Sequence, residues 1–214
     1  MIKTIDWQID ENKIGYLFIN SPPANEMTSQ FFKELVYLTK EVIREEEIRA
    51  IIISGKGRHF SSGANLDQLI GKIRDHLLLD KNGEVIEYPS FLTEEHKAFA
   101  FFSCLKIPVI AAITGVCIGS GFELALCARK RICGEGAVLG LPETTFGLMP
   151  GCGGIFLLPG LVGPGKALEL ILSGETFVAD EGLKWGIVDK VLAKKEVIPY
   201  CVELALDISR KNKR

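Results

Sequence analysis

Two continuous apolar runs constrain the fold of this chain more than any other feature. Residues 50–54 read AIIIS and residues 108–114 read PVIAAIT, and glycine-containing turns follow both runs. A strand that is apolar along its whole length must be covered on both faces, which is typical of a parallel sheet between layers of helices. Amphipathic helical patterns alternate with these runs, so the sequence predicts an α/β fold.

The N-terminal part adds a hairpin and a helix to this prediction. Residues 5–10 and 14–19 are short runs rich in β-branched and aromatic side chains, which predicts two antiparallel strands. Apolar residues at helical spacing then follow Thr28 and Ser29, which are both suitable N-caps. We expect this helix to end at the charged run 44–49.

The second half predicts two further helices and one irregular segment. The stretch 164–174 has Pro at its start and Gly at its end, as helices prefer. A last amphipathic helix is expected over about residues 195–211. Residues 66–100 contain Gly71 and Pro89 and form the least regular part, which we expect to be a mobile cover over a site.

Length, charge and cysteine usage exclude several classes of protein. The 214 residues suit one domain, and 25 basic against 27 acidic residues give a net charge of −2, which disfavours a nucleic-acid partner. The N-terminus does not resemble a signal peptide, and no apolar window reaches the roughly 18 to 20 residues of a membrane span. Six cysteines without a CxxC pair indicate reduced thiols. We therefore expect a cytoplasmic protein without membrane or nucleic-acid partners.

Familiar site motifs are incomplete in this sequence. Residues 160–167 have the G-x-x-x-x-G-K frame of a phosphate-binding loop, but Ala167 replaces the hydroxyl that binds Mg²⁺ and Pro164 removes a backbone donor. The three histidines lack the spacing of zinc ligands, so no metal site is expected. Ser120 lacks the flanks of a nucleophile elbow, and no GxGxxG follows a strand.

Three glycine-containing turns carry the site hypothesis. They lie within 58–69, 115–126 and 139–154, and the last two each contain one glutamate, Glu123 and Glu143. Two carboxylates beside free backbone N–H groups can perform acid–base chemistry next to an oxyanion. A glutamate at a helix start can also be only a stabilising N-terminal charge.

Six motifs in this order identify a family. They are FSSGANL at 60–66, AITGVCIGSGFELA at 112–125, PETTFGLMPGCGG at 142–154, PGLVG at 159–163, GKALELILSG at 165–174 and ADEGLKWGIVDKV at 179–191. Together they resemble the enoyl-CoA hydratase/isomerase (crotonase) superfamily. The resemblance implies a crotonase (ClpP/crotonase-like) fold, a spiral of ββα units with sheets covered by helices. It divides the chain into a core at 1–191 and a short C-terminal helix at 192–214, with the family's C-terminal helical segment largely missing.

The resemblance also implies a reaction and its residues. Water would add across the 2,3 double bond of an enoyl thioester, with Glu123 as the base for water and Glu143 as the proton donor to C2. The backbone N–H groups of Ala64 and Ser120 would form an oxyanion hole for the thioester oxygen. The residues implied in substrate binding are Ala24, Gly63, Ala64, Asn65, Leu66, Asp67, Gly119 and Ser120. No cofactor is expected, because the CoA thioester is itself the substrate.

Other activities remain open within this resemblance. An enoyl-CoA isomerase or a dehydratase of carrier-bound acyl groups would use the same fold, and a non-catalytic acyl-CoA-binding subunit is the alternative from another class. The partner is therefore acyl-CoA or an acyl carrier. A homotrimer or hexamer is the assembly that the resemblance implies.

Four departures from the family pattern affect these expectations. Ser120 replaces a glycine, and Asn65 replaces an aspartate, where we expect it to cap a helix. The apolar residues 155–158 replace a polar run and are expected to make that wall of the site more apolar. The sequence stops at Arg214, about where the family's C-terminal helices begin, which is consistent with either a smaller lid or a truncated chain.

Overall fold

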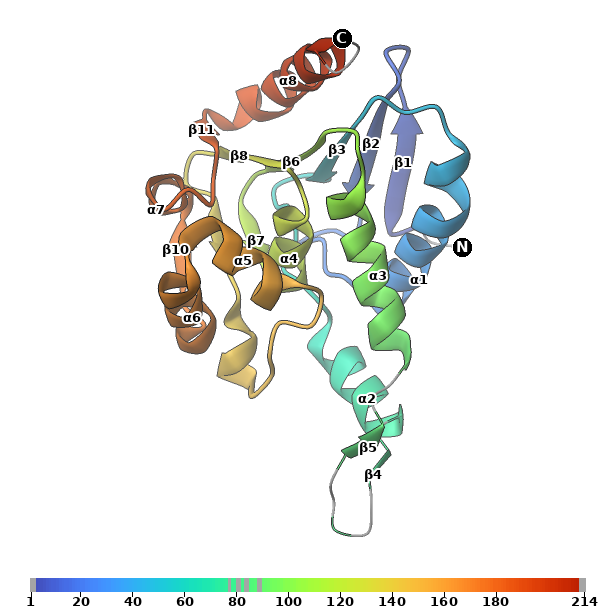
Figure 1. Cartoon of the computed structure of the whole chain (residues 1–214), viewed down its shortest axis with the longest axis vertical. Helices are drawn as coiled ribbons and strands as arrows, with labels where there is room; N and C mark the ends of the chain where they lie inside the picture. The colour runs from blue at the N-terminus through green and yellow to red at the C-terminus, as the bar shows by residue number, and fades with distance from the viewer. Residues whose placement is uncertain (1–2, 77, 80–81, 83–84, 88–89, 212–214) are drawn as a thin grey trace.

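A six-stranded mixed sheet forms the centre of the molecule (Figure 1). The computed structural model describes residues 3–211 except 77, 80–81, 83–84 and 88–89. In spatial order the strands are β1 (Ile5–Ile9), β2 (Ile14–Ile19), β3 (Ala50–Gly55), β6 (Val109–Ile113), β8 (Lys130–Gly134) and β11 (Lys190–Leu192). The hairpin β1–β2 is antiparallel, and every other neighbouring pair in this sheet is parallel.

Two smaller sheets accompany the main one. The first has the order β10-β9-β7, with β7 (Val116–Ile118) parallel to β9 (Val138–Gly140) and β10 (Thr176–Val178) antiparallel to β9. The second is an antiparallel pair of β4 (Leu78–Leu79) and β5 (Val85–Glu87), which lies at the lower end of Figure 1. The predicted α/β class is therefore confirmed.

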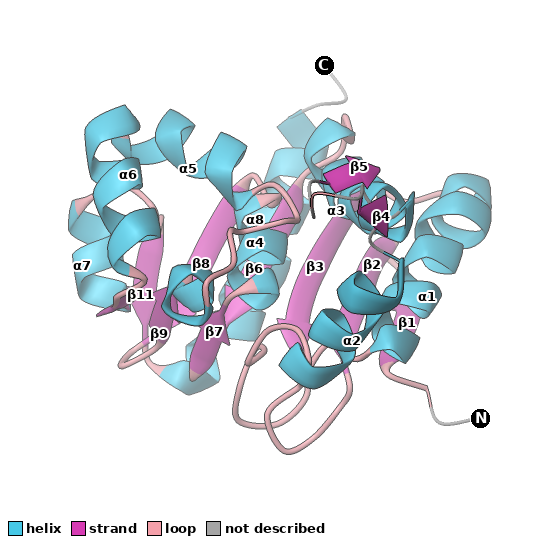
Figure 2. Ribbon diagram, turned by 90° about the horizontal axis from the view of Figure 1, so that it is seen from below, coloured by secondary structure: helices cyan, strands magenta, loops and turns pink. Residues whose placement is uncertain are grey.

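Helices cover both faces of the main sheet (Figure 2). The helices in the described residues are α1 (Ser29–Tyr37), α2 (Leu66–His76), α3 (Ser90–Cys104), α4 (Ser120–Leu126), α5 (Gly154–Val162), α6 (Pro164–Ser173), α7 (Ala179–Lys184) and α8 (Val197–Lys211). A π-helical turn at Leu38–Val42 follows α1, and short 3₁₀ turns occupy Ile43–Glu45, Pro142–Phe146 and Lys194–Glu196.

The two faces of β3 explain why its sequence is continuously apolar. Ala50 and Ile52 pack with α8 in one buried cluster. Ile51 and Ile53 belong to the larger core on the opposite face, which includes side chains of α1, α3 and α4. Alternate residues of a strand point to opposite faces, so a strand between two helical layers needs apolar side chains at every position.

Most of the predicted local elements are confirmed. The hairpin pairs Ile5 with Ile19, and the Thr28 hydroxyl caps α1 by accepting the N–H of Phe31. The helix predicted at 164–174 is α6, which begins with Pro164 and is followed by the left-handed Gly174. The last predicted helix is α8, which packs against the main sheet. The boundary drawn after residue 191 stays a prediction.

The prediction that residues 66–100 are the least regular part is wrong for most of that segment. It forms the helix α2 and most of α3, with β4 and β5 between them. Positions 77, 80–81, 83–84 and 88–89 lie outside the described residues. Gly71 weakens the helical pattern in the sequence, but a Cβ at this position would meet no neighbour within 4 Å, so the helix simply runs through it.

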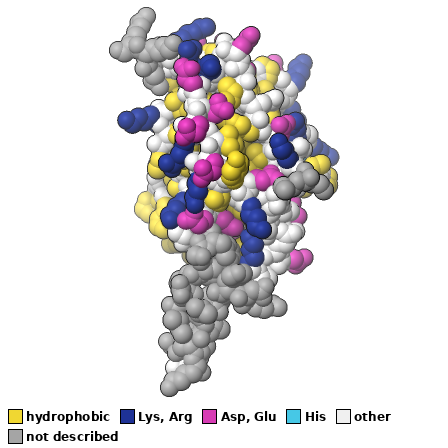
Figure 3. Space-filling model, turned by 90° about the vertical axis from the view of Figure 1, so that its right-hand side faces the viewer, with side chains coloured by type: hydrophobic (Ala, Val, Ile, Leu, Met, Phe, Trp, Pro, Cys, Tyr) yellow, Lys and Arg dark blue, Asp and Glu magenta, His cyan; other side chains and the backbone are white. Residues whose placement is uncertain are grey.

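The mixed surface charges and the free cysteines agree with what the composition indicates. On the face drawn in Figure 3, basic and acidic side chains are interspersed around a narrow apolar band. All six cysteines are free, and only Cys104 is exposed. Over the part of the chain that the structure describes, no helix is long and apolar enough to cross a membrane. The cytoplasmic location stays a prediction.

Candidate active site

Two glycine turns meet at one end of the three-stranded sheet. The segment before Gly63 pairs with β7, because Ser61 N–H donates to Val116 and the Ile118 N–H donates back to Ser61. Gly63 has a φ of +88°, and a Cβ there would lie 2.9 Å from the Ile118 carbonyl oxygen and 3.4 Å from the Ser120 nitrogen. Only glycine allows this approach, which brings both turns together.

The turns present two backbone N–H groups to the same space. The neighbouring backbone N–H groups are already used. The N–H of Gly63 donates to Ser61 Oγ, that of Asn65 donates to the Met27 carbonyl, and that of Gly119 donates to the Gly140 carbonyl. Among the described residues, no hydrogen bond uses the N–H of Ala64 or Ser120. Both of these residues line the main cavity. Free backbone N–H donors at one cavity are the kind of group that can stabilise an oxyanion.

The cavity holds about 660 Å³ and contains nearly all the residues implied by the resemblance. It is lined by Gly63, Ala64, Asn65, Leu66, Asp67, Gly119, Ser120, Glu123 and Glu143. Ala24 does not line it. Its carbonyl accepts the Ser62 N–H at 2.9 Å, so Ala24 supports the first turn from behind.

Glu123 is fixed by two backbone hydrogen bonds. Its side chain is 1% exposed, and Oε1 accepts the N–H groups of Cys152 at 2.8 Å and Gly154 at 2.9 Å. The other oxygen, Oε2, is buried and has no hydrogen-bond partner among the described residues. Burial raises the pKa of Glu123 to about 7, against the lowering effect of the Gly154 N–H and with a further increase from nearby Glu143.

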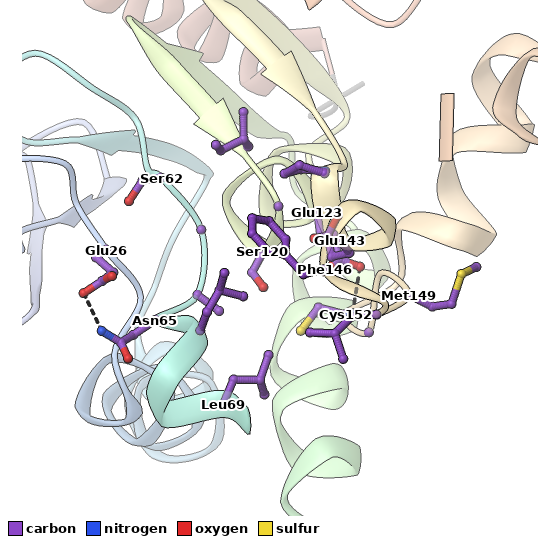
Figure 4. Close-up of a pocket in the computed structure, with 18 of the residues that line it drawn as sticks. Glu26, Ser62, Asn65, Leu69, Ser120, Glu123, Glu143, Phe146, Met149 and Cys152 are labelled. Atoms are coloured by element: carbon purple, nitrogen blue, oxygen red, sulfur yellow. Dashed lines mark hydrogen bonds between the residues drawn. The ribbon is translucent and has the colours of Figure 1, made fainter. Parts of the chain in front are cut away.

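Glu143 approaches from the opposite turn. It lies in the 3₁₀ turn Pro142–Phe146, and its Oε2 is likewise buried without a partner in the described part of the chain. Burial raises its pKa to about 7. A Cβ at Gly119 would lie 3.2 Å from Glu143 Oε1. The two glutamates therefore share one wall of the cavity, as the close-up in Figure 4 shows.

Asn65 has a structural role and also lies at the cavity. Its Oδ1 accepts the Gln68 N–H at 2.8 Å and caps the first turn of α2, which confirms the expected cap. Its Nδ2 donates to Glu26 Oε2 at 2.9 Å (Figure 4). Both side chains line the cavity, so this capped turn forms the wall that faces Glu123.

Several lining residues were not among the site residues that the sequence predicted. They are Glu26, Phe32, Leu69, Glu95, Phe146, Met149 and Cys152. Glu95 carries the clearest signal in the sequence, because it precedes Phe99 by one helical turn within an otherwise apolar helix face. Such a position needs a reason for its charge, which the sequence alone does not supply.

The expectation that residues 155–158 make a wall of the site more apolar is wrong. None of them lines the cavity, because they form the first turn of α5. Leu158 is buried in the core, whereas Phe156 is 73% exposed on the outer surface. A helical turn distributes neighbouring residues around its axis, so a continuous apolar run need not face one site.

Side chains that can bind a metal ion are not clustered in the described residues. No group of three or more His, Cys, Asp and Glu side chains there is arranged to hold a metal ion. The groups of the cavity that suit acid–base chemistry beside an oxyanion are the carboxyls of Glu123 and Glu143 and the two backbone N–H donors.

Comparisons with known proteins agree with the site motifs. The enoyl-CoA hydratase/isomerase family model matches residues 10–214. YngF of Bacillus subtilis (strain 168), which is named as an enoyl-CoA hydratase/isomerase, is 36% identical over 208 residues, which cover 96% of this chain and 76% of YngF. The fatty acid oxidation complex subunit alpha of Shewanella amazonensis is 34% identical over 213 residues, but this chain spans only 28% of its length.

Solved structures show the same fold. An enoyl-CoA hydratase from Bacillus anthracis superposes with a TM-score of 0.83 at 29% identity, covering 97% of this chain and 77% of that one. A Thermobifida fusca protein assigned as an enoyl-CoA hydratase and solved in complex with CoA gives a TM-score of 0.80 at 28% identity, covering 96% and 78%. These matches confirm the crotonase fold, and this chain belongs to the enoyl-CoA hydratase/isomerase family.

Proposed function

We propose that this protein is an enoyl-CoA hydratase, which adds water across the 2,3 double bond of an enoyl thioester. The observation that carries the proposal is that Oε2 of Glu123 and Oε2 of Glu143 are both buried in one cavity and accept no hydrogen bond from the described residues. A water molecule needs two to four polar partners, and two facing carboxyl oxygens provide them. An isomerase needs only one carboxylate to move a proton, so the second one favours hydration.

The thioester oxygen would bind between the N–H groups of Ala64 and Ser120. As the nucleophile attacks C3, negative charge develops on this oxygen, and fixed backbone dipoles stabilise it without reorganisation. Because Ser120 acts through its backbone N–H, the replacement of the family's glycine by serine leaves this role intact.

The two glutamates would divide the proton transfers. Glu123, held by the N–H groups of Cys152 and Gly154, accepts a proton from water while the oxygen bonds to C3. Glu143 donates a proton to C2, so one proton enters the product as one leaves water. Both carboxyls have pKa values near 7, which allows one to be ionised and the other protonated at neutral pH.

Hydration of crotonyl-CoA by the wild type and by two variants tests this mechanism. We expect Glu123→Gln and Glu143→Gln each to lose at least about 100-fold in kcat, the range for removal of a general acid or base. Glu135→Gln, at an exposed residue outside the cavity, should retain wild-type activity.

Other outcomes would identify other functions. Hydration that survives both substitutions would contradict the two-glutamate mechanism. Isomerisation of a 3-enoyl-CoA that depends on Glu143 alone, without hydration, would select the isomerase. Activity confined to acyl carrier thioesters would indicate the dehydratase, and tight CoA binding without turnover would indicate a non-catalytic subunit.

We further propose a homotrimer or hexamer as the assembled form. Three large apolar side chains are more than half exposed on α5 and α6, namely Phe156, Leu168 and Leu172. Exposed apolar side chains of this size on adjacent helices favour an interface between chains. Light scattering after size-exclusion chromatography measures the mass, and a monomer at all concentrations would contradict the proposal.

A further inference from the structure

A third buried carboxylate lies in the same cavity and has no part in the proposed hydration chemistry. Glu95 is on α3, lines the cavity and is 6% exposed. Its surroundings on this side are apolar: Phe99, one turn further along α3, stacks on Phe32, which itself lines the cavity. A carboxylate in such a wall requires an explanation, because burial of a charge is costly.

An ion pair with Lys72 on α2 provides part of that explanation. Lys72 Nζ lies 3.4 Å from Glu95 Oε1, and the side chains are 26% and 8% exposed. Oε2 of Glu95 accepts no hydrogen bond from any residue that the structure describes. The ion pair offsets the charge of Glu95 but uses only its Oε1, so Oε2 is left to accept another hydrogen bond.

Stability alone does not account for this arrangement. A buried ion pair seldom stabilises a fold more than apolar side chains of the same volume would. Phe32 and Leu69 line the same cavity, and an apolar side chain at residue 95 would match them without needing an ion pair. An available acceptor at this position changes which acyl chains the cavity accommodates.

The position of Glu95 relative to the proposed reaction centre follows from Cys152. The Cys152 N–H binds Glu123, and the pKa of the Cys152 thiol is raised by burial and then by the charges of Glu123 and Glu95. Cys152, Glu123 and Glu95 all line the cavity, and the turn at Cys152 adjoins α3, because a Cβ at Gly153 would lie 3.7 Å from His96 Cε1. A substrate whose thioester lies at Ala64 and Ser120 would direct its acyl chain into the cavity that Glu95 lines.

We propose that Glu95 is a specificity-determining residue that accepts a hydrogen bond from a hydroxyl group on the acyl chain, so that hydroxyacyl thioesters bind in preference to unsubstituted ones. The inference depends on the proposed function only in taking an acyl thioester as the ligand. A hydroxyl fits better than the alternatives, because Lys72 disfavours a second cation and Glu95 disfavours a carboxylate.

Calorimetric binding of saturated acyl-CoA pairs tests this inference without any hydration step. The probes are butanoyl-, pentanoyl- and hexanoyl-CoA, each compared with the same thioester carrying a terminal hydroxyl. We expect the wild type to bind the hydroxylated member at least about tenfold more tightly at one or more of these chain lengths, the scale of a hydrogen bond to a charged acceptor. A terminal carboxyl in place of the hydroxyl should weaken binding.

Two substitutions at residue 95 separate hydrogen bonding from shape. Glu95→Met keeps the length of the side chain without an acceptor and should abolish the hydroxyl preference. Glu95→Gln keeps a neutral acceptor and should retain a reduced hydroxyl preference. This variant still tests the inference if Glu95→Met does not fold. Glu94→Gln is the matched control, because Glu94 pairs with Lys40 and Lys97 and does not line the cavity.

The outcomes distinguish this inference from the proposed function. Equal affinities within every pair, absence of binding by any acyl-CoA, or a hydroxyl preference that Glu95→Met retains would overturn the role of Glu95. A wild type that shows the preference but does not hydrate crotonyl-CoA would support Glu95 and contradict the hydratase. Hydration of crotonyl-CoA by a wild type without the hydroxyl preference would support the hydratase and contradict the role of Glu95.

Discussion

Gly119 lies so close to Glu143 that a Cβ atom at residue 119 would stand 3.2 Å from Glu143 Oε1. The same glycine has a φ of +55° and immediately precedes Ser120, whose N–H is one of the two proposed oxyanion donors. One backbone position therefore connects the proposed proton donor with the proposed oxyanion hole.

Replacement of Gly119 by alanine should reduce activity far more than it reduces stability. The added methyl displaces the Glu143 carboxylate and strains the turn before Ser120, and a misplacement of about 1 Å can lower a rate about 100-fold. Gly136→Ala is the control, because Gly136 has a φ of +68° but a Cβ there meets nothing within 4 Å. Wild-type kcat for Gly119→Ala would show that this contact is not needed.

The pH dependence of hydration should be bell-shaped with a maximum near neutral pH. Glu123 must be ionised and Glu143 protonated, and burial raises both pKa values to about 7. The pair titrates as a coupled unit, so the limbs belong to the pair and not to single residues. In Glu143→Gln the alkaline limb should disappear from kcat/KM, since the remaining base only needs to lose its proton. An unchanged bell in that variant would assign the alkaline limb to another group.

The buried Glu123 should make the folded state less stable at high pH. Its carboxyl titrates near 4.5 when unfolded and near 7 when folded. Stabilisation from this site is therefore complete below about pH 4.5, is lost as the pH rises, and stays lost above about pH 7. Glu123→Gln removes the effect, so relative to the wild type it should gain on the order of 3 kcal/mol of unfolding free energy between low and high pH.

Urea unfolding at an acidic and a mildly alkaline pH measures this difference. Glu175→Gln, at an exposed glutamate outside the cavity, should show no pH-dependent gain over the wild type. If Glu123→Gln follows the pH dependence of the wild type, the carboxyl does not titrate near neutral pH in the folded protein.

Among the polar residues behind the turn at Gly63, Asn25 should contribute most to the free energy of unfolding. It is fully buried, its Oδ1 accepts the Ser21 N–H, and its Nδ2 donates to the carbonyls of Lys56 and His59. Asn25→Ala leaves these groups without their partners and should cost about 2 to 4 kcal/mol of unfolding free energy. Asn12→Ala, in the exposed turn of the hairpin, should stay within about 0.5 kcal/mol in the same thermal or urea unfolding.

The sequence predicted the sheet, and its glycine turns indicated that Glu123 and Glu143 lie at one site, because both inferences depend on local patterns. Continuous apolar runs at β3 and β6 require burial on both faces, and glycines at positions such as Gly63 mark turns that need a positive φ. The helix α2 was missed because Gly71 interrupts its pattern, although the space beside Gly71 is open. A sequence pattern reflects the average free-energy cost of a residue type in a helix, whereas the structure shows the surroundings that decide this cost at one position.

By itself, the sequence determined the α/β class, the family and the two glutamates on which the proposed acid–base chemistry rests, since each follows from periodicity or from a motif of neighbouring residues. Only the tertiary structure decided that Ala24 stands behind the cavity, that residues 155–158 face away from it, and that Glu95 and Lys72 meet at its wall. These relations join residues that are distant in the chain, and packing of whole helices and sheets, which no local pattern encodes, brings them together.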